Sequence, residues 1–126
     1  MNVEELRLYC LSKVSVTECT PFDDVTLVFK VAGKMFALIP LDEMELSVAL
    51  KCDPELAVQL REQYPAVQPG WHMNKTHWNT VKVDGSLSNR QITEMVDHSY
   101  DLVVKSLNKK QRELLENSLK KTVSRK

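Results

Sequence analysis

Alternating apolar and polar side chains predict a β-hairpin early in the chain. One face of residues 26–31 is wholly apolar, and residues 34–39 form the return strand, which Pro40 ends. The connecting pair Ala32-Gly33 fits a two-residue hairpin loop, because glycine readily adopts a positive φ. Short connections favour antiparallel neighbours, since a parallel crossover needs a dozen or more residues. We predict further strands at residues 15–20, 46–51, 67–70 and 77–83, with a turn at residues 21–24.

Two capping boxes predict where a first and a later helix begin. Asn2 with Glu5 precedes a helix at residues 3–13, and Ser88 with Gln91 precedes the clearest helix of the chain. Behind the second box, helical spacing is followed by Ile92, Met95, Val96, Ser99, Leu102, Val103 and Ser106.

Two more helices are predicted from their ends. Asp53-Pro54 supplies an N-cap and a first helical residue, and the helix should end near residue 63, because a residue before proline disfavours helix. That residue is Tyr64, which precedes Pro65. A last helix has Asn108 as its cap and an apolar face of Leu114, Leu115 and Leu119.

The elements follow the order α-β-β-β-β-α-β-β-α-α, which is an α+β arrangement. We predict a single domain over residues 1–126, in which an antiparallel sheet is flanked by helices on one side. The hydrophobic content of 43% and the charged content of 27% fit a globular protein rather than a disordered one. A chain of this length buries about two-thirds of its unfolded surface, so it can fold without cross-links.

Cysteine usage and the lack of long apolar runs indicate a cytoplasmic protein. The three cysteines are widely spaced and form no CxxC motif, so we expect reduced thiols, with Cys10 and Cys19 in or near the core. No apolar run approaches the ~20 residues that span a bilayer. The acidic, amphipathic N-terminus does not resemble a secretory signal. We expect a monomer that does not bind membranes.

The charge is unevenly distributed, although the formal net charge is zero. Residues 1–65 carry a net charge of −5, residues 66–102 carry −1, and residues 103–126 carry +6. A basic end of this kind either faces nucleic acid or a membrane, or is a solvated helix with a basic tail. Strong nonspecific duplex binding usually needs a positive net charge, so any DNA binding should be local or modest.

The histidines and cysteines give little support to catalysis or metal binding. Cys52 precedes a predicted helix N-terminus, which can lower its pKa, but no sequence signature joins it to His72 or His77. These three residues are the plausible metal ligands, whereas a structural zinc site needs four. Residues five apart in a strand also point to opposite faces. We expect no catalytic residue, metal or cofactor, with Cys52 as a partly buried structural thiol.

Residues 68–80 form a polar, aromatic segment typical of a recognition surface. They hold both tryptophans and two of the three histidines. Asn74, Lys75, Asn79 and Thr80 offer the donors and acceptors that contact phosphates and base edges. The exposure of this segment decides whether it is a recognition surface or a hydrogen-bonded structural corner.

The two tryptophans have a functional and a structural interpretation. Trp71 and Trp78 can stack on bases or act as wedges, or both can pack in the core. We predict a core position for Trp78, on a strand face shared with Thr80 and Lys82, which is more polar than a core face usually is. Trp71 follows Pro69-Gly70, and its position stays open.

A longer motif runs through the same segment: Pro69-Gly70-Trp71-His72-Met73-Asn74-Lys75-Thr76-His77-Trp78-Asn79-Thr80-Val81. It resembles the signature P-G-[YWF]-H-x-N-K-x-H-W-x-[TS]-V of the MmcQ/YjbR family. Trp71 stands where tyrosine or phenylalanine is also common. Flanking matches occur in the family's order at Pro21-Phe22 with Asp24, at residues 33–37, at residues 50–54 and at residues 99–103.

The resemblance implies a fold similar to that of CyaY, the bacterial frataxin, with a so-called double-wing arrangement. It also implies the description "DNA-binding protein", which is an expectation, because fold alone does not establish function. A frataxin-like iron role is not indicated, since Glu4 and Glu5 are the acids of the first predicted helix.

The functional prediction is a non-enzymatic, cytoplasmic DNA-binding module. One alternative is a protein–protein interaction or adaptor domain that uses the same segment. Another is a small-molecule or metal-dependent function built on His72, His77 and Cys52. The residues predicted to contact nucleic acid are Trp71, His72, Asn74, Lys75, His77, Asn79, Lys109 and Lys110.

Overall fold

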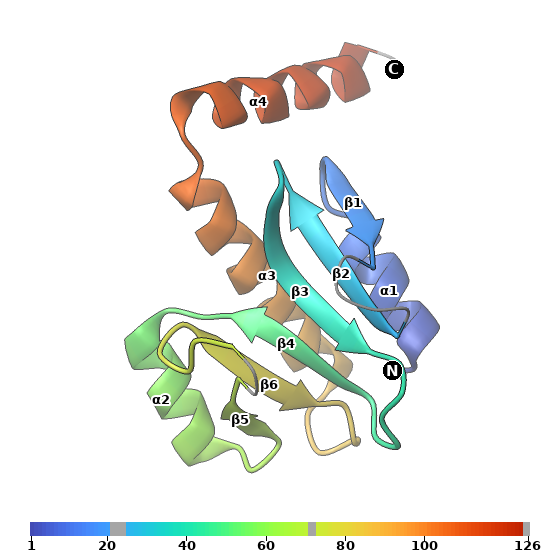
Figure 1. Cartoon of the computed structure of the whole chain (residues 1–126), viewed down its shortest axis with the longest axis vertical. Helices are drawn as coiled ribbons and strands as arrows, with labels where there is room; N and C mark the ends of the chain where they lie inside the picture. The colour runs from blue at the N-terminus through green and yellow to red at the C-terminus, as the bar shows by residue number, and fades with distance from the viewer. Residues whose placement is uncertain (21–24, 71–72, 125–126) are drawn as a thin grey trace.

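The computed structural model describes residues 1–20, 25–70 and 73–124, with side chains up to residue 117. It has the predicted α+β architecture and element order (Figure 1). The predicted turn at residues 21–24 lies outside the described residues. The elements are α1 (Val3–Leu11), β1 (Val16–Cys19), β2 (Thr26–Val31), β3 (Lys34–Pro40), β4 (Ser47–Lys51), α2 (Pro54–Gln63), β5 (Val67–Pro69), β6 (Trp78–Lys82), α3 (Asn89–Ser106) and α4 (Lys109–Ser124).

A six-stranded antiparallel sheet forms the centre of the fold, with the strand order β1-β2-β3-β4-β6-β5. The first four strands follow chain order, as their short connections predict. β6 then pairs with β4, with Lys51 opposite Trp78, and β5 pairs with the other side of β6. This crossover places β6 and β5 at one edge of the sheet.

The local signals in the sequence are confirmed. Ala32 and Gly33 join β2 to β3 with φ values of 50° and 81°, so both loop residues take the positive φ of a tight hairpin. The caps are formed by hydrogen bonds from Glu5 N to Asn2 Oδ1 at 2.8 Å, Leu56 N to Asp53 Oδ2 at 3.3 Å, Gln91 N to Ser88 Oγ at 3.1 Å and Gln111 N to Asn108 Oδ1 at 2.9 Å. The first helix ends at Leu11, two residues before the predicted end.

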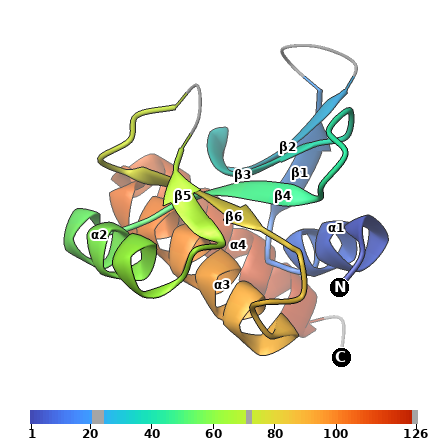
Figure 2. The same cartoon turned by 90° about the horizontal axis from the view of Figure 1, so that it is seen from below.

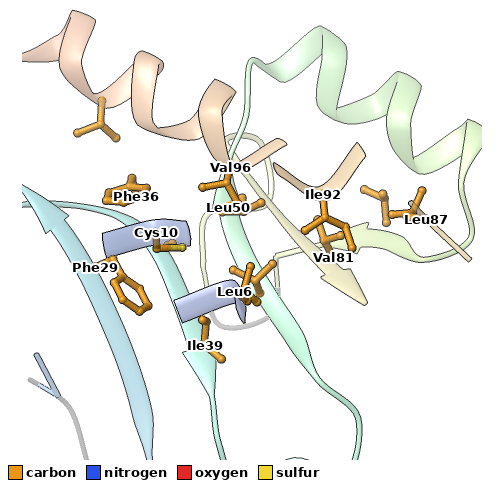
Figure 3. Close-up of a cluster of buried hydrophobic side chains, with 14 of the residues drawn as sticks. Leu6, Cys10, Phe29, Phe36, Ile39, Leu50, Val81, Leu87, Ile92 and Val96 are labelled. Atoms are coloured by element: carbon orange, nitrogen blue, oxygen red, sulfur yellow. The ribbon is translucent and has the colours of Figure 1, made fainter. Parts of the chain in front are cut away.

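The helices α1, α2 and α3 lie on one face of the sheet (Figure 2). The main core fills the space between the two layers, where α1 contributes Leu6 and Cys10, and α3 contributes Ile92 and Val96 (Figure 3). These residues are fully or almost fully buried against the apolar face of β2, β3, β4 and β6. The four buried residues of α3, which are Ile92, Val96, Ser99 and Val103, all belong to the predicted stripe, whereas Ser106 at its end is exposed.

Ser99 fastens α3 to the middle of the sheet. Its hydroxyl donates to Phe36 O at 2.6 Å and accepts from Lys51 N at 2.9 Å, and its side chain is fully buried. Because β3 carries Phe36 and β4 carries Lys51, one small polar side chain holds three elements in register. A serine inside an apolar stripe is thus a structural contact.

A smaller apolar cluster covers part of the opposite sheet face. Val28, Leu38 and Trp78 form it, and Cys19 and Met73 pack against it. Cys10 belongs to the main core and Cys19 to the edge of this cluster, so their predicted positions are confirmed. In the described parts of the chain, no helix is long and apolar enough to cross a membrane.

Candidate nucleic-acid interface

The connection between β5 and β6 exposes part of the predicted recognition segment. Asn74, Lys75, Thr76 and His77 are all exposed, and we call them the 74–77 loop. Asn74 shapes the loop, because its Oδ1 accepts from Thr76 N at 2.9 Å and its carbonyl oxygen accepts from Trp78 N at 2.9 Å. Trp71 and His72 lie outside the described residues. The loop therefore offers one lysine, one histidine and small polar groups to a partner.

Arg61 of α2 holds the 74–77 loop from the helix side. Its Nε donates to Asn79 Oδ1 at 2.7 Å, and its terminal nitrogen donates to the carbonyl oxygens of Lys75 and of Trp78, the latter at 3.2 Å. One guanidinium thus satisfies three acceptors and fixes the loop to α2. Sequence reasoning missed Arg61, because carbonyl partners across a tertiary contact leave no mark in local sequence.

The base of the loop is closed by tight backbone contacts. Gly70 N donates to Trp78 O at 2.9 Å, and Cys52 N donates to His77 O at 2.8 Å. A Cβ added at Gly70 would lie 2.8 Å from Trp78 Cβ and 2.9 Å from Trp78 O, which is closer than atoms pack. Glycine is needed here because the two strands approach closely.

Trp78 and Asn79 point to opposite faces of β6, as successive strand residues must. Trp78 is 8% exposed and packs in the smaller cluster, on the face shared with Thr80 and Lys82, so its predicted core position is confirmed. Asn79 is 2% exposed, faces the helix layer and is bound by Arg61. The structure therefore separates Asn79 from the exposed residues of the 74–77 loop.

Lys109 and Lys110 are exposed at the start of α4, where other cations surround them. Lys105 and Arg112 flank them in sequence, and Lys34 from the β2–β3 hairpin donates to Ser106 O at 3.2 Å. We call these five residues the α3–α4 junction. Gln111 Nε2 donates to Ala32 O at 3.2 Å, which holds the start of α4 against the hairpin.

The α3–α4 junction and the 74–77 loop lie at different places on the molecule. Figure 1 shows α4 beyond the β2–β3 hairpin, whereas the β5–β6 connection lies beside α2. The two predicted contact regions are therefore not brought together into one continuous patch. α4 also carries Glu113 and Glu116 close to Lys109 and Arg112, so these two acids partly offset the positive charge of its first turn.

Cys52, which was predicted to be a partly buried thiol, is buried between β4 and α2. Its side chain is 5% exposed, and burial, with a smaller effect from Asp53, raises the pKa of the thiol to about 11. Burial thus keeps the thiol protonated at neutral pH. Across residues 1–20, 25–70 and 73–124, no group of three or more His, Cys, Asp or Glu residues is placed to hold a metal ion.

Comparisons with known proteins identify the family. A YjbR family model matches residues 11–102. The Escherichia coli K12 protein called "Uncharacterized protein YjbR" is 40% identical over 115 residues, which are 91% of this chain and 98% of that protein. The Escherichia coli O157:H7 protein called "Uncharacterized protein YbdF" is 34% identical over 107 residues, which are 85% of this chain and 88% of that protein.

Solved structures share the fold. The crystal structure of the Deinococcus radiodurans protein DR2400, domain DUF419, superposes with a TM-score of 0.85 at 39% identity and covers 91% of this chain and 88% of that chain. The crystal structure of the Pseudomonas syringae protein PsR293 gives a TM-score of 0.71 at 28% identity, with 81% of this chain and 98% of that chain covered. The family model, the relatives and the shared fold place this chain in the YjbR family, which is the MmcQ/YjbR family of the sequence motif.

Proposed function

We propose that this chain is a DNA-binding module without catalytic activity, which contacts the DNA backbone through the α3–α4 junction. The charge of that junction carries the proposal. Lys34, Lys105, Lys109, Lys110 and Arg112 are exposed, and within the described residues none of them forms an ion pair with a carboxylate. Exposed lysine and arginine side chains neutralise phosphates and release counterions, which supplies most of the free energy of nonspecific DNA binding.

The 74–77 loop has a secondary part in this proposal. Lys75 adds one positive charge, and Asn74, Thr76 and His77 add hydrogen-bonding groups on the exposed surface. Arg61 holds the backbone of the loop in place, so little conformational entropy is lost when the loop binds. Asn79 is left out of the direct contacts because it is buried.

The proposed affinity is modest. Residues 1–65, about half of the chain, carry a net charge of −5 that repels phosphates, and the whole chain has no net charge. Salt screens both this repulsion and the attraction at the junction. At ~0.1 M salt, charges that are more than ~10 Å apart interact little. We therefore expect binding at low salt that is lost near physiological ionic strength.

A matched pair of single-charge variants tests the site. Lys110→Gln and Arg90→Gln each remove one exposed positive charge from a helix, but Arg90 lies at the start of α3, away from the junction. By fluorescence anisotropy with a labelled duplex at ~50 mM salt, Lys110→Gln should weaken binding about three- to tenfold and Arg90→Gln less than about twofold. Equal effects of the two variants would move the site elsewhere. Absence of binding would leave protein interaction as the alternative.

A further inference from the structure

A pocket of about 290 Å³ is lined by residues of α2, α3, β4 and β6. Figure 2 shows α2 and α3 on the same face of the sheet. Its apolar wall includes Leu56 and Leu60 from α2 and Met95 from α3, all of which are only half-buried. Leu50 and Val81 of the sheet form its apolar floor. The volume is close to the lower end of small-molecule sites, which begin at roughly 300 Å³.

The pocket wall contains a buried hydrogen-bond donor without a partner. Among the described residues, Asn79 Nδ2 is the buried side-chain polar atom that lacks a hydrogen bond. Arg61 Nε donates to Asn79 Oδ1 at 2.7 Å, so a flipped amide would place two donors against each other. The amide orientation is therefore fixed, with Oδ1 toward Arg61 and Nδ2 left without a partner. Buried polar groups in native proteins normally have partners, so an orphan donor in a pocket wall indicates a missing one.

A second donor lies in the same wall. Tyr64 OH accepts from Gln91 Nε2 at 3.2 Å, which leaves its hydroxyl hydrogen free to donate. On the opposite side, His98 Nε2 accepts from Asp53 N at 3.2 Å, so the ring nitrogen nearest α2 is already engaged. The wall thus contains two donors that suit an oxygen acceptor, Asn79 Nδ2 and the Tyr64 hydroxyl, whereas Glu94 of the same wall is an acceptor.

The charges around the pocket favour a neutral acceptor over a carboxylate. Glu94 contributes a negative charge at the wall, and Arg61 is already engaged with Asn79 Oδ1. Lys51 belongs to the wall, but its side chain alternates with that of Leu50 and so belongs to the opposite face of β4. A buried carboxylate would lack a cation to compensate for its desolvation.

We propose that this pocket binds a small neutral ligand that is apolar over most of its surface and carries one carbonyl oxygen. The carbonyl accepts hydrogen bonds from Asn79 Nδ2 and from the Tyr64 hydroxyl, and the apolar body packs against Leu56, Leu60 and Met95. The site is independent of the α3–α4 junction, so its test does not depend on DNA binding.

The test uses two probes that differ in the carbonyl oxygen, acetophenone and ethylbenzene. Each is titrated into the full-length, isotope-labelled protein, and NMR follows the side-chain amide of Asn79 and the methyl group of Met95. Acetophenone should shift both signals saturably and bind about tenfold more tightly than ethylbenzene, as expected for one or two hydrogen bonds in a buried site. No saturable shift with either probe would show that the pocket holds solvent only and would overturn the proposal. Equal affinities would overturn the role of the carbonyl.

Two variants assign the donors. Asn79→Asp keeps an oxygen for Arg61 but replaces the donor Nδ2 with an acceptor, so its affinity for acetophenone should fall about threefold or more, toward that for ethylbenzene. Tyr64→Phe keeps the ring and removes the hydroxyl, and it should weaken acetophenone binding about threefold even if Asn79→Asp fails to fold. Lys110→Gln, remote from the pocket, should bind both probes like the parent. If Asn79→Asp folds and retains the parental preference for acetophenone, the assignment of the donor is wrong.

Discussion

At the scale of single residues, a few polar side chains hold elements together from buried or half-buried positions. Arg61 ties α2 to the 74–77 loop, and Ser99 ties α3 to β3 and β4. Such contacts matter because leaving a buried donor or acceptor without a partner costs more free energy than forming one hydrogen bond contributes. Asn79 is the informative exception, since half of its amide is satisfied and half is not.

Ser99→Ala should lower the free energy of unfolding by about 2–4 kcal/mol, because Phe36 O and Lys51 N both lose their partner. Urea unfolding followed by tryptophan fluorescence measures this change. Thr93→Ala is the matched control on the same helix, since it removes only a local hydrogen bond to Arg90 O and should cost less than about 0.5 kcal/mol. Similar losses in the two variants would contradict the structural part given to Ser99.

The Cys52 thiol should make stability depend on pH in the alkaline range. Burial raises its folded-state pKa from 9.0 to about 11, so the unfolded thiol ionises first as the pH rises. The stabilisation is therefore complete below pH 9.0 and is lost as the pH rises through about 11. Between these two pH values, the free energy of unfolding should fall less steeply with pH in Cys52→Ala than in the parent. The two slopes should differ by up to about 1.4 kcal/mol per pH unit. Parallel pH curves for parent and variant would rule out the raised pKa.

At the scale of elements, the predictions from sequence succeed where the signal is local. Asn2 with Glu5 and Ser88 with Gln91 define helix starts within four residues, and Ala32-Gly33 defines a hairpin within two. For the last helix, the cap at Asn108 was predicted correctly, but the packing of its apolar face was not. Leu115 packs against the main core, whereas Leu114, predicted on the same apolar face, is 60% exposed. Periodicity identifies an apolar stripe but does not say what covers it.

Removal of α4 should leave the rest of the fold intact. Its described contacts with the sheet and core are few, chiefly Gln111 with Ala32 O and Leu115 with the core, and it lies outside the residues matched by the family model. A chain that stops after Leu107 should lose about 1–2 kcal/mol of unfolding free energy and keep a cooperative transition. Thermal unfolding by circular dichroism checks this. A non-cooperative transition would show that α4 is part of the folding unit.

At the scale of the whole molecule, sequence reasoning predicted the fold but only part of the candidate site. Alternation along β6 correctly predicts that Trp78 and Asn79 point to opposite faces of the sheet. It does not predict that both faces are covered, each by a different apolar cluster. The hydrogen bonds of Arg61 and the pocket between α2 and α3 depend on tertiary contacts between segments that are distant in sequence, so local patterns do not predict them. The family resemblance is confirmed, and the DNA-binding function remains the proposal made above.

The measurement that tests the central claim most directly is a salt titration of duplex DNA binding by anisotropy, with the parent and a Lys109→Gln/Lys110→Gln variant. The account predicts a log–log slope of about −3 to −4 for the parent, as expected if four or so of the five junction cations contact phosphates, and a slope flatter by about two for the variant. Identical slopes for the two proteins, or no binding at ~50 mM salt, would contradict it.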